Sequence, residues 1–67
     1  MIGILLGSGF EEIEAITTFD ILKRAGADLE LVSVTGSLQV SSARNLVVQS
    51  DTLIDEVIDK KYDMIVI

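Results

Sequence analysis

Short apolar runs along the chain alternate with segments of helical periodicity. The first run, Ile2 to Leu6, ends at Gly7-Ser8-Gly9, and a continuous apolar run of this length bounded by glycines favours a strand covered on both faces. The segment from Asp28 to Val34 alternates at first and then becomes apolar, which is typical of a second strand. A third apolar run, Met64 to Ile67, follows Tyr62-Asp63. The pattern therefore predicts three strands of one buried sheet.

A helix is predicted from Glu11 to Ala25, because acidic residues fill its first turn, basic residues fill its last turn, and Gly26 stands just beyond its end. Its apolar residues cover more than half of the circumference when they are placed at about 100° per residue. They are Ile13, Ala15, Ile16, Phe19, Ile21, Leu22 and Ala25. We expect such a helix to be covered on more than one side, by its own sheet and by a second surface.

Two smaller elements are predicted between the second and third strands. Leu38 to Val40 and Leu46 to Val48 can form a small hairpin, and Thr52, with Asp55 three residues on, resembles a capping box that opens a short helix through about Lys60. The order is then β-α-β-ββ-α-β, in which the strand–helix–strand crossover makes the strands parallel. This is the N-terminal half of a doubly wound α/β sheet, in one structural unit over residues 1–67. Because a final strand left as a bare apolar edge is an aggregation hazard, we expect further polypeptide to complete the domain.

Length and composition support an incomplete core. A chain of 67 residues buries only about 60% of its unfolded surface. The sequence has no Cys and no His, so neither a disulfide nor a zinc site of the usual ligand types can compensate. Yet 49% of its residues are hydrophobic, which suits part of a larger core. No metal and no cofactor are expected.

The charge restricts the partners that the chain could bind. Its net charge is −6 and its five basic residues are scattered, which argues against nucleic acid and against an anionic membrane surface. The apolar runs are far shorter than the roughly 20 residues that span a bilayer. The start of the chain lacks the basic region and cleavage site of a signal peptide. The sequence therefore favours a cytoplasmic protein.

Glu14 is the most informative polar residue. It lies a full turn into the predicted helix, has no basic residue three or four positions on, and shares a largely apolar face with Thr18 and Ile21. A carboxyl group buried there without a cation could remain protonated and donate a hydrogen bond. The alternative is ordinary stabilisation of acids by a helix N-terminus, which explains Glu11 and Glu12 adequately.

Other polar features have simpler interpretations. Gly7-Ser8-Gly9 lies where a dinucleotide-binding loop would lie, but Glu12 replaces the third glycine and the acids would repel a pyrophosphate, so a tight turn is favoured. The loop does follow the carboxyl end of a strand, where open α/β sheets bind ligands. Arg44 is a lone cation in a turn and is expected to be solvated. Ser41 and Ser42 have no His to activate them, which excludes a serine nucleophile.

Two segments together resemble the start of the ThiJ/PfpI superfamily, the group that includes the Parkinsonism-associated protein deglycase. They are Gly9-Phe10-Glu11-Glu12-Ile13-Glu14-Ala15 and Asp20-Ile21-Leu22-Lys23-Arg24-Ala25-Gly26. Ser42-Ala43-Arg44 and Tyr62-Asp63 fall where that superfamily has similar segments, so the resemblance covers the entire chain. It implies a flavodoxin-like sandwich that forms a homodimer partly through its first helix.

The resemblance also implies roles for individual residues. The third glutamate of the motif donates a hydrogen bond to a reactive cysteine in that superfamily, and the matching residue here is Glu14, the candidate catalytic residue. By the same matching Gly9 lies beside the pocket and Arg44 near the dimer interface and the site, so that Gly9, Glu11 and Arg44 are candidate substrate-binding residues. Family activities include hydration of glyoxal-type aldehydes, removal of glycation adducts, amidase or peptidase action, holdase chaperoning and a link to thiazole monophosphate biosynthesis.

The departure from the superfamily is large. The Pro-Gly-Gly loop that follows its third strand, and its reactive cysteine, are both absent from this sequence. We therefore expect an N-terminal fragment that is inert by itself, with the cysteine on the remaining C-terminal portion, which could be a separate chain. A non-catalytic stress-response or chaperone dimer is the alternative. A receiver-like domain ranks last, because it would need paired acids after the first strand and an Asp ending the third.

Overall fold

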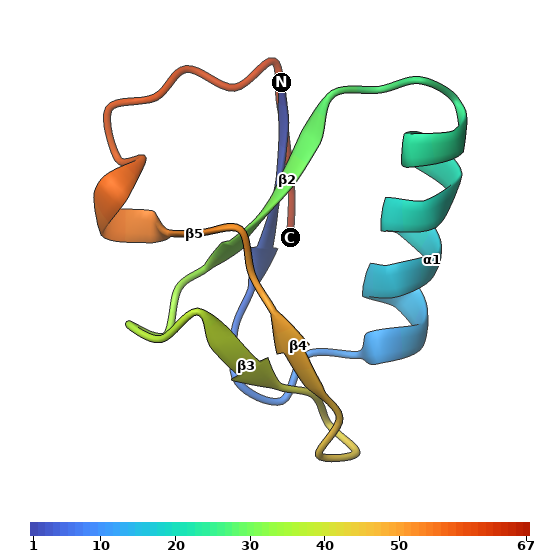
Figure 1. The fold of residues 1–67 in the computed structure, drawn as a ribbon, viewed down its shortest axis with the longest axis vertical. Helices are drawn as coiled ribbons and strands as arrows, with labels where there is room; N and C mark the ends of the chain where they lie inside the picture. Colours follow the sequence, from blue (N-terminus) through green and yellow to red (C-terminus); the bar gives the residue numbers. More distant parts are fainter.

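A four-stranded parallel sheet forms the centre of the computed structural model, which describes all residues 1–67 (Figure 1). Its strand order is β5-β2-β1-β6. The strands span Ile2–Leu6 (β1), Leu29–Ser33 (β2), Thr52–Leu53 (β5) and Met64–Val66 (β6). The three predicted strands are confirmed within one residue at each end, and β5 is an additional short strand at the edge.

The order of the strands reverses at β1. Helix α1 (Glu12–Arg24) connects β1 to β2, and the chain later passes to the other side of β1 to form β6. Both neighbours run parallel to β1, with Ile4 paired to Leu31 on one side and to Val66 on the other. This is the arrangement of the N-terminal part of a flavodoxin-like doubly wound sheet, as the sequence pattern predicts.

Helix α1 ends where the sequence indicates, at a left-handed glycine. Gly26 has a φ of +87°. Its N–H donates to the Lys23 carbonyl at 3.1 Å, and the Ala27 N–H donates to the Leu22 carbonyl at 3.0 Å. These two bonds form a Schellman motif, which satisfies carbonyl groups that the end of the helix would leave unpaired.

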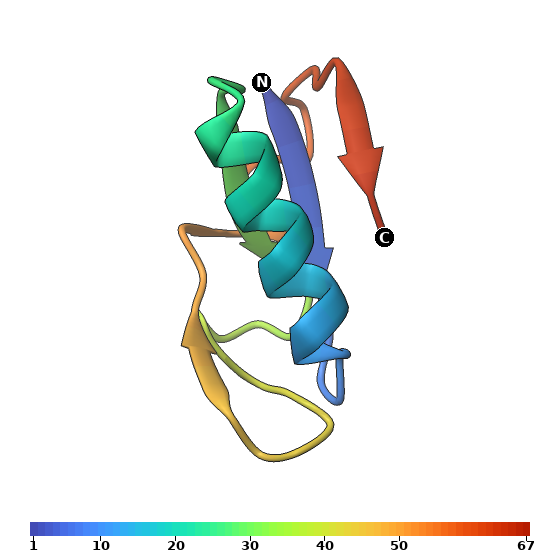
Figure 2. The same cartoon turned by 90° about the vertical axis from the view of Figure 1, so that its right-hand side faces the viewer.

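Helix α1 covers one face of the sheet with a single stripe of apolar side chains (Figure 2). Ala15, Phe19 and Leu22, spaced four and three residues apart, pack against the core formed by Ile4, Leu6, Leu29, Leu31 and Val40. The other sides of the helix are bare, since Ile13 is 65% exposed and Ile21 is 59% exposed. The helix is thus apolar on more sides than this chain covers, as predicted.

A two-stranded antiparallel hairpin lies below the carboxyl ends of the sheet strands in Figure 1. Its strands are β3 (Gln39–Ser41) and β4 (Val47–Gln49), each one residue later than predicted. Backbone bonds join the hairpin to the loop between β1 and α1: the Gly9 N–H donates to the Ser41 carbonyl, and the Ala43 N–H donates to the Phe10 carbonyl, each at 2.8 Å. The hairpin therefore holds the start of α1 in place.

The helix predicted from Thr52 to about Lys60 is wrong. Only one 3₁₀ turn, η1 (Ile54–Glu56), forms there, and Thr52 belongs to β5. The cause is a pair of bonds to β2: the Asp51 N–H donates to the Leu31 carbonyl at 2.9 Å, and the Asp51 carboxylate accepts from the Leu31 N–H at 2.8 Å. These bonds align the backbone at Asp51 beside β2 in an extended conformation, so Thr52 cannot act as a helix cap.

The outer side of β6 has no strand beside it (Figure 2). Met64 and Ile65 on this edge strand are 55% and 53% exposed.

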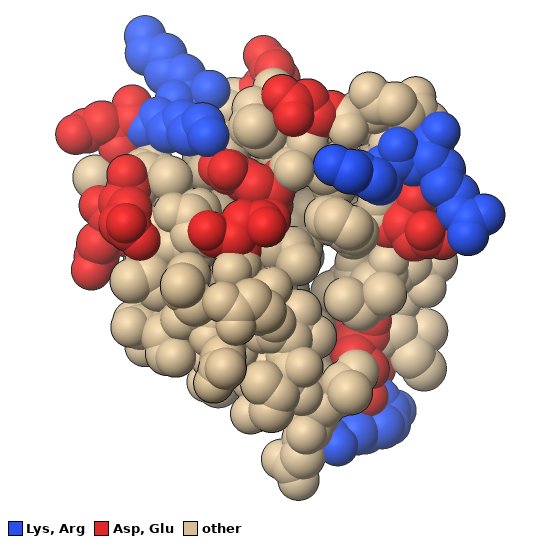
Figure 3. Space-filling model, in the orientation of Figure 1, with Lys and Arg blue, Asp and Glu red and all other residues tan.

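None of the helices is both long and apolar enough to cross a membrane. In the space-filling view, charged side chains gather in the upper half and at one lower corner, and a broad uncharged area lies between them (Figure 3).

Candidate functional site

A pocket of about 280 Å³ opens where β1 and β6 end. Its lining comes from three elements and the loop after β1, and consists of Ile4, Leu5, Leu6, Phe10, Glu11, Glu14, Ala15, Thr18, Val66 and Ile67. Because the strand order reverses between β1 and β6, this is the switch point at which open α/β sheets bind ligands. The candidate catalytic residue Glu14 therefore lies at the switch point of the sheet.

Glu14 and Thr18 lie one helical turn apart on α1, and both line this pocket, as their spacing predicts. The condition for Glu14 to act as a protonated donor is that its carboxyl group is buried, and residues 1–67 alone do not meet it, because Glu14 is exposed. The reason is geometric: the β6 side of the pocket is a bare sheet edge, and no segment of the chain covers it. No Lys or Arg lines the pocket, so Glu14 has no cation beside it.

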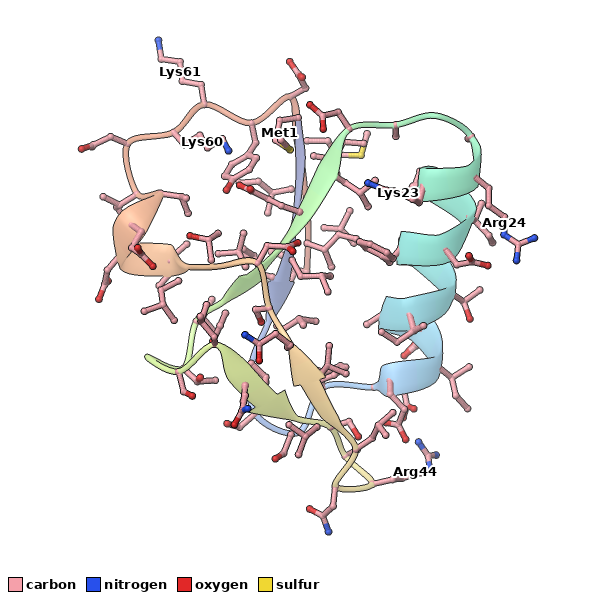
Figure 4. All side chains as sticks on the ribbon, viewed as in Figure 1. Met1, Lys23, Arg24, Arg44, Lys60 and Lys61 are labelled. Atoms are coloured by element: carbon pink, nitrogen blue, oxygen red, sulfur yellow. The ribbon has the colours of Figure 1, made fainter.

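Arg44 connects the hairpin to the start of α1. Its Nη1 atom lies 2.6 Å from Glu11 Oε1 and 3.1 Å from Glu12 Oε1, and Figure 4 shows the side chain at the tip of the hairpin beside the helix. Arg44 is 62% exposed, which confirms the expectation of a solvated residue, but it is not a lone cation, because it pairs with both glutamates. It does not line the pocket and reaches it only through Glu11.

The two glutamates at the start of α1 differ in environment. The pKa of Glu12 is lowered, chiefly by a hydrogen bond from its own backbone N–H and further by Arg44. Hydrogen bonds to Glu11 and then to Glu12 raise the pKa of Arg44. Arg44 and Glu11 are 62% and 39% exposed, so the ion pair between them orients the groups more than it stabilises the fold, whereas the Glu12 side chain is only 12% exposed.

Gly9 forms the turn between β1 and α1. Its φ of +81° lies in the left-handed region, where a side chain would strain the backbone. Gly9 itself does not line the pocket, although Phe10 and Glu11 directly after it do. The role of Gly9 in substrate binding stays a prediction, and its observed role is to shape the loop that carries these two residues.

The sequence places Thr18 on the helix face of Glu14, but no local pattern in it indicates that Val66 and Ile67 line the same pocket. Only the pairing of β6 with β1 brings Val66 and Ile67 to α1, and that contact joins segments more than 45 residues apart. The available signal was the switch-point rule applied to three predicted strands. Among the residues of this chain no cluster of three or more His, Cys, Asp or Glu side chains could hold a metal ion.

The fold and the pocket define a class, the N-terminal part of a flavodoxin-like α/β protein with a pocket at its switch point. The model of the DJ-1/PfpI family matches residues 1–67. Protein DJ-1 homolog A of Arabidopsis thaliana is 44% identical over 57 residues, which is 85% of this chain. Protein dj-1beta of Drosophila melanogaster is 31% identical over 64 residues, or 96% of the chain. The chain belongs to the DJ-1/PfpI family.

Solved structures agree with this assignment. Oxidized DJ-1 of Toxoplasma gondii superposes with a TM-score of 0.92 at 36% identity, over 96% of this chain and 35% of that one. A DJ-1 superfamily protein of Salmonella typhimurium, solved as a cysteine-to-alanine mutant, gives a TM-score of 0.92 at 34% identity over the same share of this chain. The chain spans 14% of the Arabidopsis protein and 34% of the Drosophila protein.

Proposed function

We propose that residues 1–67 are the N-terminal third of a cysteine-dependent DJ-1/PfpI enzyme and supply Glu14 to its active site. The observation that supports this is the position of Glu14, in the switch-point pocket with no cation beside it. The pocket is open along β6, so polypeptide beyond Ile67 can cover Glu14 and bring a cysteine to it. The chain alone has no cysteine and is expected to be inert.

The proposed chemistry follows from what a carboxyl group does beside a thiol. A Glu14 carboxyl that becomes buried remains protonated more readily and donates a hydrogen bond to the thiolate, which is the nucleophilic form of cysteine. The thiolate then attacks the carbonyl carbon of a small aldehyde and forms a hemithioacetal, and Glu14 donates its proton to the oxygen that becomes negative. With an amide, the tetrahedral intermediate expels the amine, which takes this proton as it leaves, and water then hydrolyses the thioester. Apolar lining from β1 and β6 suits a small substrate with few charges.

The test uses the full-length protein that carries this segment. Glu14→Leu removes the proton donor and is expected to lower the turnover of a glyoxal-type aldehyde by about 10²–10⁴-fold, the usual contribution of a positioned acid or base. Glu14→Gln keeps an N–H donor and should retain part of the activity. Glu56→Gln changes the same charge on η1, away from the pocket, and is the matched control.

The reactivity of the cysteine separates the proposed role from a loss of folding. The rate of thiol alkylation is measured against pH for each variant, because it follows the thiolate fraction. Glu14→Leu should shift this profile to higher pH, whereas Glu56→Gln should not. Unchanged turnover and an unchanged profile in Glu14→Leu would remove Glu14 from the mechanism.

A non-catalytic dimer, with a stress-response or chaperone role, is the second candidate. It is favoured by the apolar surface that α1 and the hairpin leave bare: a hollow of about 290 Å³ lined by Ile13, Ile16, Leu46, Glu12 and Thr17. Apolar surface of this kind marks protein–protein contacts, and a second copy packed through α1 would cover it.

The oligomeric state tests this surface independently of catalysis. Ile13→Glu in the full-length protein places a charge on the exposed face of α1 and should convert a dimer to a monomer in sedimentation velocity. Ile58→Glu alters a residue that is 70% exposed elsewhere and is the control. If Ile13→Glu remains dimeric, the first helix is not the interface. If Glu14→Leu keeps full activity while Ile13→Glu abolishes holdase action, the chaperone role is favoured.

A further inference from the structure

A cluster of four residues joins β1, β2 and the segment before β6 at the amino ends of the strands. Its members are Gly3, Glu30, Lys60 and Tyr62. The Tyr62 hydroxyl donates to Glu30 Oε1 at 2.6 Å, and Lys60 Nζ donates to the same oxygen at 2.9 Å. Lys60 Nζ also lies 5.5 Å from the centroid of the Tyr62 ring. Gly3 lies under the ring, since a Cβ atom built there would be 3.0–3.1 Å from three of its carbons.

Few other contacts within residues 1–67 hold strand β6. It pairs with β1 over three residues, and no other strand of this chain pairs with its outer edge. Between η1 and β6 the chain has no regular structure, and its bonds to the sheet come from Lys60, Tyr62 and Asp63. Asp63 is 86% exposed where it pairs with the N-terminal amine, so this ion pair is screened by solvent.

The cluster and the pocket lie at opposite ends of the same strand. Figure 4 shows Lys60 and Met1 at one end of the sheet and Arg44 at the other. Four residues of extended chain, about 13 Å, separate Tyr62 from Val66. Val66 and Ile67 form the β6 wall of the pocket, so the contacts of Tyr62 hold the segment that leads into this wall.

We propose that Tyr62, bonded to Glu30 and stacked on Gly3, is a positioning residue for the switch-point pocket, which it serves by fixing β6 against β1. The inference rests on the proposed function for its catalytic consequence, but not for its structural part. Glu30 is the residue that makes this possible, because it is the single charged residue within β1, β2 and β6. Its register partner in β1 is Gly3, so both lie on the same face of the sheet.

The test compares Tyr62→Phe, Glu30→Leu and Glu30→Gln in the full-length protein by hydrogen exchange of backbone amides. Tyr62→Phe and Glu30→Leu should raise the exchange rate of β6 amides about tenfold while the amides of β2 change less than twofold. Glu30→Gln keeps an acceptor oxygen for the Tyr62 hydroxyl and should restore most of the protection. Asp20→Asn removes an equal charge from an exposed pair on α1 and is the control.

Steady-state kinetics of the full-length protein distinguish a positioning role of Tyr62 from a purely structural one. A loosened pocket wall should raise KM for the aldehyde several-fold in Tyr62→Phe and leave kcat within about twofold, whereas Glu14→Leu should lower kcat. Equal acceleration of exchange at all amides, or unchanged exchange in β6, would overturn the inference. Faster exchange in β6 with an unchanged KM would also overturn it. Activity that survives Glu14→Leu contradicts the proposed function alone.

Discussion

Replacing Gly3 with Ala tests the packing of Tyr62 on the sheet most directly. The new Cβ atom would lie 3.0 Å from Cε1 and 3.1 Å from Cδ1 and Cζ of the Tyr62 ring, where ordinary contacts are 3.4–4 Å. The ring cannot simply turn aside, because its hydroxyl is bonded to Glu30 at 2.6 Å. Either the ring shifts by a few tenths of an ångström and weakens this bond, or β1 moves away from it.

The magnitude follows from two opposing effects. Overpacking of this kind costs about 1–3 kcal/mol. Replacing a strand glycine with alanine returns roughly 0.5–1 kcal/mol, because the unfolded chain loses conformational freedom. We therefore expect Gly3→Ala to lower the free energy of unfolding by up to about 2.5 kcal/mol, measured by urea denaturation of the full-length protein.

A double-mutant cycle identifies the cause. Tyr62→Ala removes the ring, and Gly3→Ala should then be neutral or stabilise by about 0.5–1 kcal/mol. The coupling energy between the two positions should accordingly reach about 1–3 kcal/mol. An equal loss from Gly3→Ala in both backgrounds would refute the reasoning, since the cost would then come from the backbone of β1 and not from the ring.

Four further predictions concern stability. Gly26→Ala should cost about 1–2 kcal/mol in urea denaturation, because its φ of +87° is left-handed. Asp51→Ala should cost about 1–3 kcal/mol by leaving the Leu31 N–H unpaired, and Asp51→Asn should restore most of it. Hydrogen bonds from Tyr62 and then from Lys60 lower the pKa of the Glu30 carboxyl. The free energy of unfolding should therefore fall as the pH drops below about 4.5, and this fall should be smaller in Glu30→Gln. Burial, and then the hydrogen bond to Glu30, raise the pKa of the Tyr62 hydroxyl to about 12. The free energy of unfolding should therefore also fall as the pH rises from 10 to about 12.

Each of these predictions has a contrary result. A neutral Gly26→Ala would mean that the Schellman motif re-forms with alanine. An Asp51→Asn variant as unstable as Asp51→Ala would assign the loss to charge and not to the missing acceptor. The alkaline loss should disappear in Tyr62→Phe, and its persistence there would assign it to another group.

Local signals explain why most elements could be predicted from the sequence. β1 and β6 are short runs of mostly apolar residues, and β2 alternates before it becomes apolar, while α1 carries acids at its start and is followed by Gly26. Such features act within a few residues, so they can be read without knowing the fold. Thr52 shows where this fails: its local pattern favours a helix cap, but Asp51 bonds to Leu31, 20 residues away, and draws the segment into β5.

In the candidate site, too, local features could be predicted and contacts between distant segments could not. The spacing of Glu14 and Thr18 on one helix face was predictable, because helix geometry is local. The pairing of Arg44 with Glu11, 33 residues apart, was not, because it depends on how the hairpin docks against the loop before α1. The exposure of Glu14 could not be predicted either, since it depends on what lies beyond β6.

Composition and burial together explain that exposure. Although 49% of the residues are hydrophobic, only 10 of 67 residues are buried. Most of the bare apolar side chains lie on α1, on the hairpin and on β6, which are the surfaces that a longer α/β domain would cover. The Drosophila relative, of which this chain spans 34%, is long enough to supply that cover. If cover over β6 also encloses the pocket, the same polypeptide that buries Ile65 changes the environment of Glu14. Stability and catalysis are then coupled through β6, and a variant that loosens this strand should affect both.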